Sequence, residues 1–376
     1  MIILPRNILV MALMLVLAIS GPVQGQDTTP TVSEAAVSAA RAAVNGERPL
    51  NRVGKGKAGP IISPPPRTIV REAEPITPPP EHRLNVMLDW YLNLYHAPLI
   101  VAQERGLFDR EGLEVTLTMP ADPSVPPKLV AARRTELAIT SQPRLHLLVE
   151  QGLPLIRVGT LVPLPLNALL VREDSGIGSL SELKGKTIGY ALEDQARLLL
   201  DGMLASQSVS PKDMKLKRVD FALARSLIQN EVDAVIGAQR HMERRQMAQE
   251  GVTAIEFAVE EHGVPLYDEM ILIANRDVLK QHHRDIANFL DALQSATVWL
   301  INHPEQAWEL VRRARPALDT EINARAWPET LRYLALRPGV LQEQRYVRFE
   351  AYLQKRGLIE ALTPVKRLAV ELGSSP

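Results

Sequence analysis

From residue 83 onward the sequence alternates short aliphatic runs with longer amphipathic stretches, and this alternation limits the possible folds more than any other feature. Short branched or aliphatic runs are typical of buried strands, whereas apolar residues at a 3.6-residue period are typical of helices. The predicted strands are residues 84–88, 113–117, 137–139, 155–162, 168–171, 187–190, 234–236 and 270–274. The predicted helices between them are residues 96–104, 144–150, 196–206 and 223–230. The chain is therefore predicted to be an α/β protein.

After residue 274 the pattern contains helices only, at residues 284–301, 304–313, 319–334 and 345–356. An α/β body that ends in helices predicts a closing region packed on the first lobe. We expect two α/β lobes, with a ligand between them against loops at the carboxyl ends of the strands. Lobe 1 is predicted to comprise residues 83–166 and 268–376, and lobe 2 residues 167–267. The segment 263–269, just before the chain returns to lobe 1, is the expected hinge.

The first residues have the layout of a secretory signal peptide. One basic residue, Arg6, precedes an apolar run at residues 8–19, and a cleavage site is predicted after Gly25. The run is shorter than the roughly 20 apolar residues that a membrane span needs, although an uncleaved anchor remains an alternative. Residues 26–82 are rich in proline and alanine and contain no aromatic residue, which predicts a disordered tether. We predict a periplasmic protein that is not a lipoprotein.

Composition excludes several kinds of chemistry. The sequence contains no cysteine, so disulfides, thiolate metal sites, thiol nucleophiles and lipid attachment are excluded. Its 43 basic and 43 acidic residues balance, which argues against nucleic acid as a partner. The clusters His282-His283 and 260–262 are interpreted as solvated surface, because adjacent side chains point in different directions. Since the familiar enzyme motifs are missing as well, we predict no catalytic residue, no metal and no cofactor.

A group of aromatic residues follows the first predicted strand. Trp90, Tyr91 and Tyr95 lie within six residues of one another, beside Asn93 and His96, in a chain with only 4% aromatics. Flat apolar faces with nearby amide and imidazole groups suit a planar heterocycle, because stacking supplies contact and the polar edges supply orientation. Aromatic side chains that fill the base of a lobe are the alternative interpretation.

Two later stretches have a similar character. Glu243, in a polar stretch after a short strand, could accept hydrogen bonds from an amino-substituted ring, or it could be a surface carboxylate facing Arg244 and Arg245. Tyr267, in the expected hinge, could face the cleft. The complete set of candidate ligand-binding residues is Trp90, Tyr91, Asn93, His96, Ser141, Asn167, Tyr190, Glu193, Gln239, Glu243 and Tyr267.

These segments carry a resemblance to a known family. The run from Leu88 to Tyr91, with Asn93 and the triplet His96-Ala-Pro98, resembles the opening of the thiamine-pyrimidine-binding family of ABC-transporter solute-binding proteins. The similarity continues in order over residues 84–335. It implies a type II periplasmic-binding fold with C-terminal helices on lobe 1. It also implies a hydroxymethyl- or formylamino-aminopyrimidine ligand and an ABC permease in the inner membrane as partner. We expect a monomer.

The resemblance also defines the alternatives. Fungal relatives are enzymes that make the pyrimidine from their own histidine with pyridoxal phosphate, iron and a cysteine-rich motif. A cysteine-free chain fits that chemistry poorly, although His96 would be its reactive group. A retuned sensor or interaction protein of the cell envelope is a further alternative. Departures from the family pattern at Leu94 and Tyr95, at residues 191–195, and at His241 and Met242 fall on expected ligand-facing positions, which predicts an altered specificity.

Overall fold

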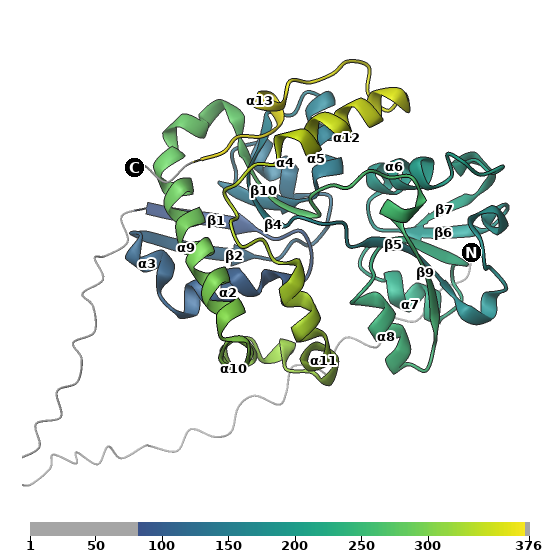
Figure 1. The fold of residues 1–376 in the computed structure, drawn as a ribbon, viewed down its shortest axis with the longest axis horizontal. Helices are drawn as coiled ribbons and strands as arrows, with labels where there is room; N and C mark the ends of the chain where they lie inside the picture. The colour runs from purple at the N-terminus through teal and green to yellow at the C-terminus, as the bar shows by residue number, and fades with distance from the viewer. Residues whose placement is uncertain (1–81, 373–376) are drawn as a thin grey trace, which may run out of the picture. The chain divides into compact units, whose positions relative to one another are not determined.

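The computed structural model describes residues 82–372. They fall within one compact unit, Ala73–Pro376, and contain two five-stranded sheets (Figure 1). The predicted signal peptide and all of the predicted tether except His82 lie outside the described residues, so both stay predictions. Within the described residues, no helix is long and apolar enough to cross a membrane.

The first sheet has the strand order β2-β1-β3-β10-β4. Strands β1 and β2 pair in parallel, as do β1 and β3, whereas β10 runs antiparallel to both β3 and β4. Strands β3, β4 and β10 are buried along their whole length, as their continuous apolar runs predict. The strands are β1 (His82–Met87), β2 (Leu113–Thr118), β3 (Leu137–Thr140), β4 (Leu155–Val162) and β10 (Met270–Asn275). We call the part built on this sheet lobe 1.

The second sheet has the order β7-β6-β8-β5-β9 and forms lobe 2. Strands β6, β7 and β8 run parallel to one another in the centre and at one edge, and β5 runs antiparallel to β8 and β9. The strands are β5 (Asn167–Arg172), β6 (Thr187–Tyr190), β7 (Lys215–Arg218), β8 (Ala234–Gln239) and β9 (Ala254–Ala258). All of lobe 2's strands come from one continuous stretch of chain, inserted between β4 and β10.

Helices pack on both sheets (Figure 1). The long helix α9 lies against α2 and buries Phe289, Leu293 and Leu300 on one face, as its helical period predicts. Lobe 1 carries α2 (Ala97–Glu104), α3 (Leu107–Arg110), α4 (Pro126–Ala131), α5 (Gln142–Glu150), α9 (His283–Asn302), α10 (Pro304–Ala314), α11 (Glu321–Thr330), α12 (Glu343–Lys355) and α13 (Val365–Leu368). Lobe 2 carries α6 (Glu193–Met203), α7 (Leu223–Ile228) and α8 (Glu243–Gln249).

The eight strands predicted from the sequence all occur, and two more were not predicted. Strand β7 has the sequence KLKR and is largely exposed at the edge of its sheet, so it carries no apolar run. Strand β9, at the other edge, is only partly buried. Edge strands need less apolar surface than central ones, which explains why β7 and β9 were not predicted. The domain limits given above stay a prediction.

Helix α12 contacts both lobes. Its Tyr346 belongs to the lobe 1 core, whereas Phe349 and Leu353 pack in the core of lobe 2. At its end Arg356 donates to the Asp201 carboxylate of α6 at 2.6 Å. The C-terminal helices therefore pack on lobe 1 and also support the neighbouring face of lobe 2.

Gly202 on α6 allows α12 to pack closely against lobe 2. A Cβ at Gly202 would lie 2.7 Å from Cγ2 of Val264 and would also collide with the Tyr352 hydroxyl of α12. We expect Gly202→Ala to lower the free energy of unfolding by about 1–3 kcal/mol, because overpacking forces the side chains apart. Urea unfolding measures the change. Gly178→Ala is the matched control, since the nearest atom there lies 3.9 Å away; equal stability of both variants would contradict the packing described.

Candidate ligand-binding cleft

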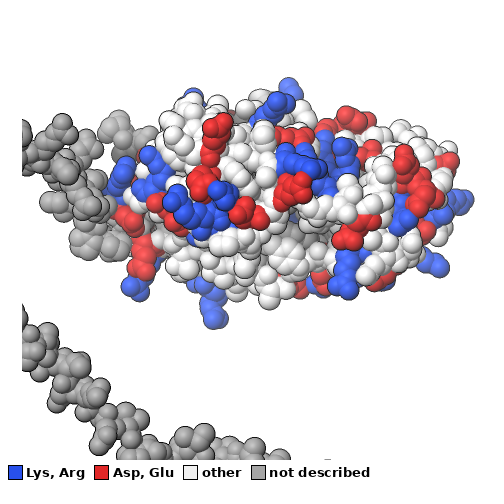
Figure 2. Space-filling view, turned by 90° about the horizontal axis from the view of Figure 1, so that it is seen from below, with Lys and Arg blue, Asp and Glu red and all other residues white. Residues whose placement is uncertain are grey.

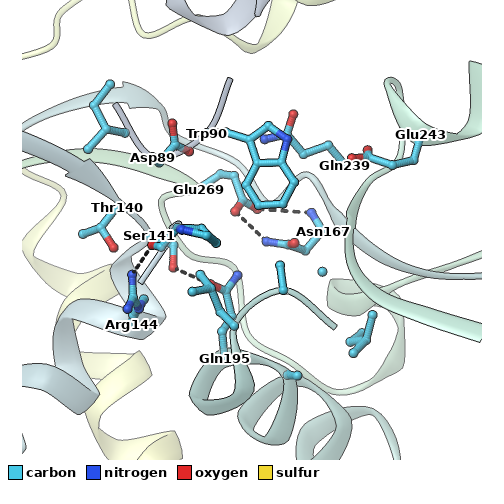
Figure 3. Close-up of a pocket in the computed structure, with 17 residues that line it drawn as sticks. Asp89, Trp90, Thr140, Ser141, Arg144, Asn167, Gln195, Gln239, Glu243 and Glu269 are labelled. Atoms are coloured by element: carbon cyan, nitrogen blue, oxygen red, sulfur yellow. Dashed lines mark hydrogen bonds between the residues drawn. The ribbon is translucent and has the colours of Figure 1, made fainter. Parts of the chain in front are cut away.

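A cavity lies between the lobes where several strands end (Figure 3). It encloses about 660 Å³ of empty space, part of which is open to solvent. Lobe 1 lines it with Asp89, Trp90, Pro123, Ile139, Thr140, Ser141, Arg144 and Glu269. Lobe 2 lines it with Asn167, Ala191, Leu192, Gln195, Ala196, Ile236, Gly237, Gln239 and Glu243.

Trp90 supplies a flat apolar wall. It follows β1, and its indole stands among the polar side chains of the site in Figure 3. Although it belongs to lobe 1, it packs against a lobe 2 core cluster and makes an edge contact with Phe221, with ring centroids 4.5 Å apart. The half-buried indole can therefore stack on a ring held between the lobes.

Glu269 and Asn167 form a hydrogen-bonded pair at the base of the cavity, beside the first residue of β10. Glu269 accepts from the backbone N–H of Leu166 at 2.7 Å, from the backbone N–H of Asn167 at 3.1 Å and from Asn167 Nδ2 at 2.5 Å. The Tyr267 hydroxyl donates to Glu269 at 3.2 Å and accepts from Asn167 at 3.1 Å. Burial raises the pKa of Glu269 to about 7 against the lowering effect of these bonds. Glu269 is thus held by several hydrogen bonds and has a pKa close to neutral pH.

Glu243 differs from Glu269 because one of its oxygens has no partner. It is 7% exposed, and its Oε2 atom makes no hydrogen bond. Burial raises its pKa to about 7. A buried, unsatisfied carboxyl oxygen is costly, so a ligand group that pairs with it recovers that free energy. Glu243 is therefore the strongest candidate for direct ligand contact.

Among the described residues that line the cavity, Arg144 is the one cation, and it is bonded within the protein. Its side chain is 4% exposed. It donates to the carbonyls of Pro123 and Ser124 at 3.1 and 3.2 Å and to Asp194 of lobe 2 at 3.4 Å. Nearby, the Ser141 hydroxyl donates to Gln195 Oε1 of lobe 2 at 3.3 Å. These contacts join α5 to α6 across the cleft.

Five of the predicted residues line the cavity together: Trp90, Ser141, Asn167, Gln239 and Glu243. Tyr267 lies directly behind this wall, fully buried, and reaches the cavity only through Asn167 and Glu269. Tyr267 thus positions the Asn167 amide through its hydroxyl, and its ring does not stack on a ligand.

Asn93 and His96 do not line the cavity, because both are buried in a local cap. The Asn93 side chain accepts from the Tyr95 N–H at 2.9 Å, and the Asn93 N–H donates to His96 Nδ1 at 3.1 Å. The other ring nitrogen, Nε2, contacts the Asp89 carboxylate at 3.0 Å. Their place beside the site is therefore structural: they hold the loop that carries Asp89 and Trp90.

Three other predicted residues lie outside the cavity. Tyr91 is 50% exposed and contacts Phe221. Tyr190 and Glu193 line an adjoining outer depression, which shares Arg144, Ala191 and Leu192 with the cavity. The Tyr190 hydroxyl faces Glu193 there at 3.4 Å. Glu193 is also bound to Arg197. The strand-end position of Tyr190 was predicted correctly, but its side chain turns toward this outer surface.

Most of the residues that depart from the family pattern do not face the cavity, although the sequence predicted ligand-facing positions for them. Leu94 and Tyr95 are fully buried in the lobe 1 core, so they do not add bulk to the cavity. His241 contacts Glu329 of α11 at 3.1 Å, and Met242 packs against the lobe 1 core. Only the 191–195 stretch lines the cavity, through Ala191, Leu192 and Gln195.

Sequence reasoning missed Asp89, Thr140, Arg144, Gln195 and Glu269 as lining residues. Asp89 and Thr140 stand at strand ends, a position that could have identified them. Arg144 and Gln195 lie in the first turns of α5 and α6, next to such strand ends. Among the described residues no group of three or more metal-ligating side chains occurs.

The two buried carboxyl groups predict a pH-dependent stability. A folded-state pKa raised from 4.5 to about 7 means that the folded protein retains a proton that the unfolded chain loses. The stabilising contribution is present below pH 4.5 and is lost as pH rises toward 7. We expect the difference in unfolding free energy between wild type and Glu243→Gln to shift by as much as ~3 kcal/mol over this window. Urea unfolding at pH 4.5, 6 and 8 tests it; parallel pH profiles would contradict it.

The NMT1/THI5 like family model matches residues 93–307. A Haemophilus influenzae protein named putative thiamine biosynthesis protein is 43% identical over 78% of this chain and 93% of that relative. The formylaminopyrimidine-binding protein of Halalkalibacterium halodurans is 32% identical over 60% of this chain and 68% of that relative. A Uromyces fabae protein named 4-amino-5-hydroxymethyl-2-methylpyrimidine phosphate synthase is 27% identical over 67% of this chain and 77% of that relative.

Among solved structures, the alkanesulfonate-binding protein SsuA of Xanthomonas axonopodis pv. citri, bound to MOPS, matches with a TM-score of 0.62. It is 16% identical and covers 77% of this chain and 98% of that chain. At this identity the likeness bears on the fold alone. Together with the two mixed sheets, it confirms the predicted type II periplasmic-binding fold.

Proposed function

Because the chain belongs to the NMT1/THI5 like family, we propose that it is the solute-binding component of an ABC importer and binds an aminopyrimidine precursor of thiamine. One observation carries the ligand class: the Trp90 ring and the unpartnered Glu243 carboxyl group line the same interlobe cavity. A formylaminopyrimidine-binding relative supports the choice of ring.

The proposed contacts follow from the chemistry of the ring. An aminopyrimidine presents an exocyclic amine beside a ring nitrogen, which together donate and accept. A carboxyl group whose pKa lies near 7 meets both needs, since it accepts from the amine and, when protonated, donates to the ring nitrogen. Trp90 stacks on the ring face, and the amides of Asn167 and Gln239 bind groups on its edge.

The charges of the cavity favour an uncharged or protonated ring over a phosphorylated one. Asp89, Glu243 and Glu269 face the cavity, and the single cation, Arg144, is held by Asp194 and two carbonyls. A phosphate would meet carboxylates without a free cation to offset them. We therefore propose that the ligand is the free pyrimidine rather than its phosphate ester.

The proposed partner is a permease in the inner membrane, which would receive the ligand from the closed protein in the periplasm. The signal-like segment at residues 1–25 supports export, and the family's solute-binding members support the transport role. On the face seen in Figure 2, basic and acidic side chains are interspersed. Such a face lacks the single-sign field that nucleic acid binding requires.

A ligand screen by thermal shift tests the proposal. Protein unfolded and refolded to remove any co-purified ligand is heated with hydroxymethyl- and formylamino-aminopyrimidines, with their phosphate esters, and with small alkanesulfonates. We expect the free pyrimidines alone to raise the melting temperature, because a ligand that binds only the folded state stabilises it. Stabilisation by sulfonates or by no compound would contradict the proposed ligand.

Pyrimidine synthesis is the second candidate, favoured by the relatives that are named synthases. The residues of this chain fit that chemistry poorly. The sequence has no cysteine, and His96, the expected reactive group, is fully buried between Asn93 and Asp89. A retuned sensor that acts through residues 26–82 is a third candidate, and pull-down partners that survive deletion of this segment would count against it.

A further inference from the structure

We propose that Phe221 of lobe 2 is a positioning residue for the ligand: it fixes the Trp90 indole over the cavity and closes the cleft at its mouth. This inference rests on the proposed function. Trp90, Tyr91 and Phe221 together are called the aromatic latch. Phe221 lies outside the cavity lining, and no sequence feature singled it out.

The aromatic latch spans the two lobes. Trp90 and Tyr91 follow β1 of lobe 1, whereas Phe221 precedes α7 of lobe 2. The ring of Phe221 lies 4.5 Å from that of Trp90 at an interplanar angle of 72°, and 4.4 Å from that of Tyr91 at 37°. The first is a favourable edge-to-face geometry. Because Trp90 lines the cavity and its ring contacts Phe221 on the other lobe, the position of the indole depends on closure of the lobes.

An ionic contact ties the loop that carries Phe221 to a different loop of lobe 1, the one that follows β2. Arg218, the last residue of β7, donates to Asp122 of lobe 1 at 2.7 Å and to Asp220 of its own loop at 2.5 Å. Asp220 has a φ of +47°, a left-handed conformation that is uncommon for residues other than glycine. The backbone turns sharply there and directs Phe221, the next residue, toward lobe 1.

The arrangement assigns the latch a kinetic role. A ligand stacked beneath Trp90 leaves only after the indole moves, and the indole moves freely only after its contact with Phe221 breaks. Loss of the Phe221 ring should therefore speed dissociation more than it slows association, since the on-rate depends on encounter with an open cleft.

A double-mutant cycle tests this role. Stopped-flow kinetics with a free aminopyrimidine compare wild type, Phe221→Ala, Trp90→Phe and the double variant. We expect Phe221→Ala to raise the dissociation rate about three- to tenfold, Phe221→Tyr to restore the wild-type rate, and the Phe221 effect to shrink in the Trp90→Phe background. An unchanged dissociation rate, or equal effects in both backgrounds, would overturn the proposal.

A second measurement needs no ligand. The chain has no cysteine, so Lys128→Cys in lobe 1 and Lys212→Cys in lobe 2 provide two unique spin-label sites on exposed positions. Electron-spin distance measurements on the full chain should give a longer or broader distribution for Phe221→Ala than for the parent. Identical distributions would overturn the latch. A latch effect without binding of any heterocycle would instead contradict the proposed function and leave the closing contact in place.

Discussion

Replacing Glu243 with alanine should weaken binding of an aminopyrimidine by about two to three orders of magnitude. Truncating one partner of a buried charged hydrogen bond costs roughly 2–5 kcal/mol. Glu243 is the cavity residue with an unpartnered buried carboxyl oxygen, so in the proposed complex its partner is the ligand itself. Isothermal titration calorimetry measures the change in Kd. Glu243→Gln should lose less, because it keeps an acceptor of the same shape.

Glu250→Ala is the matched control for this change. Glu250 lies just beyond the end of the same helix, α8, and is exposed. It should leave both Kd and stability unchanged, because no cavity contact involves it. If Glu243→Ala bound the pyrimidine as tightly as wild type does, the proposed binding mode would be wrong even if the ligand were correct.

Replacing Asp268 with alanine should lower the free energy of unfolding by about 3–5 kcal/mol, the usual effect of removing one member of a buried ion pair. Asp268 precedes β10, where the chain returns to lobe 1. It contacts Arg345, and it accepts from the hydroxyls of Thr160 at 3.2 Å and Tyr346 at 3.3 Å. Its carboxylate is 4% exposed. Its loss would leave the Arg345 guanidinium without its charged partner.

Asp174→Ala provides the comparison for this change. Asp174 pairs with Arg172 at 2.6 Å, but its side chain is 67% exposed. Solvent screens such pairs, so we expect no measurable change in the urea midpoint. Equal effects of the two substitutions would show that the Asp268 cluster does not stabilise the crossing between the lobes.

The fold followed closely from the sequence because central strands leave a strong signal. Strands β3, β4 and β10 are buried on both faces and must be apolar throughout. Strands β7 and β9 lie at sheet edges and carry polar residues, so no pattern distinguishes them from loops. Helix α12 was predicted, but its contact with lobe 2 depends on Phe349 and Leu353 meeting residues far away in the sequence.

The site could be predicted only in part, because it also depends on contacts that the sequence does not reveal. Trp90 and Glu243 stand out because an aromatic residue and a carboxylate follow strands. Asn93 and His96 also follow a strand. The Asn93 side chain, however, is bonded to loop backbone, and the His96 ring to the Asn93 N–H and the Asp89 carboxylate, which a sequence does not reveal. Glu269 precedes β10, and only the antiparallel insertion of that strand in the sheet brings it beside Asn167.

Two residues that depart from the family pattern, Leu94 and Tyr95, also have orientations that the sequence did not reveal. Leu94 and Tyr95 stand between two polar residues, so the sequence suggested that they face a ligand. Both belong instead to the core beneath the loop, in a segment that contacts α2 and α11. The cavity thus differs less from the family pattern than the sequence indicated, and an aminopyrimidine remains the ligand that we propose.

Calorimetric titration of the refolded, ligand-free protein with a free aminopyrimidine and with its phosphate ester tests the central claim most directly. We expect saturable binding of one free pyrimidine per chain, lost in Glu243→Ala, and at least tenfold weaker binding of the ester. Absence of heat with the free pyrimidine, or tighter binding of the phosphate ester, would contradict it.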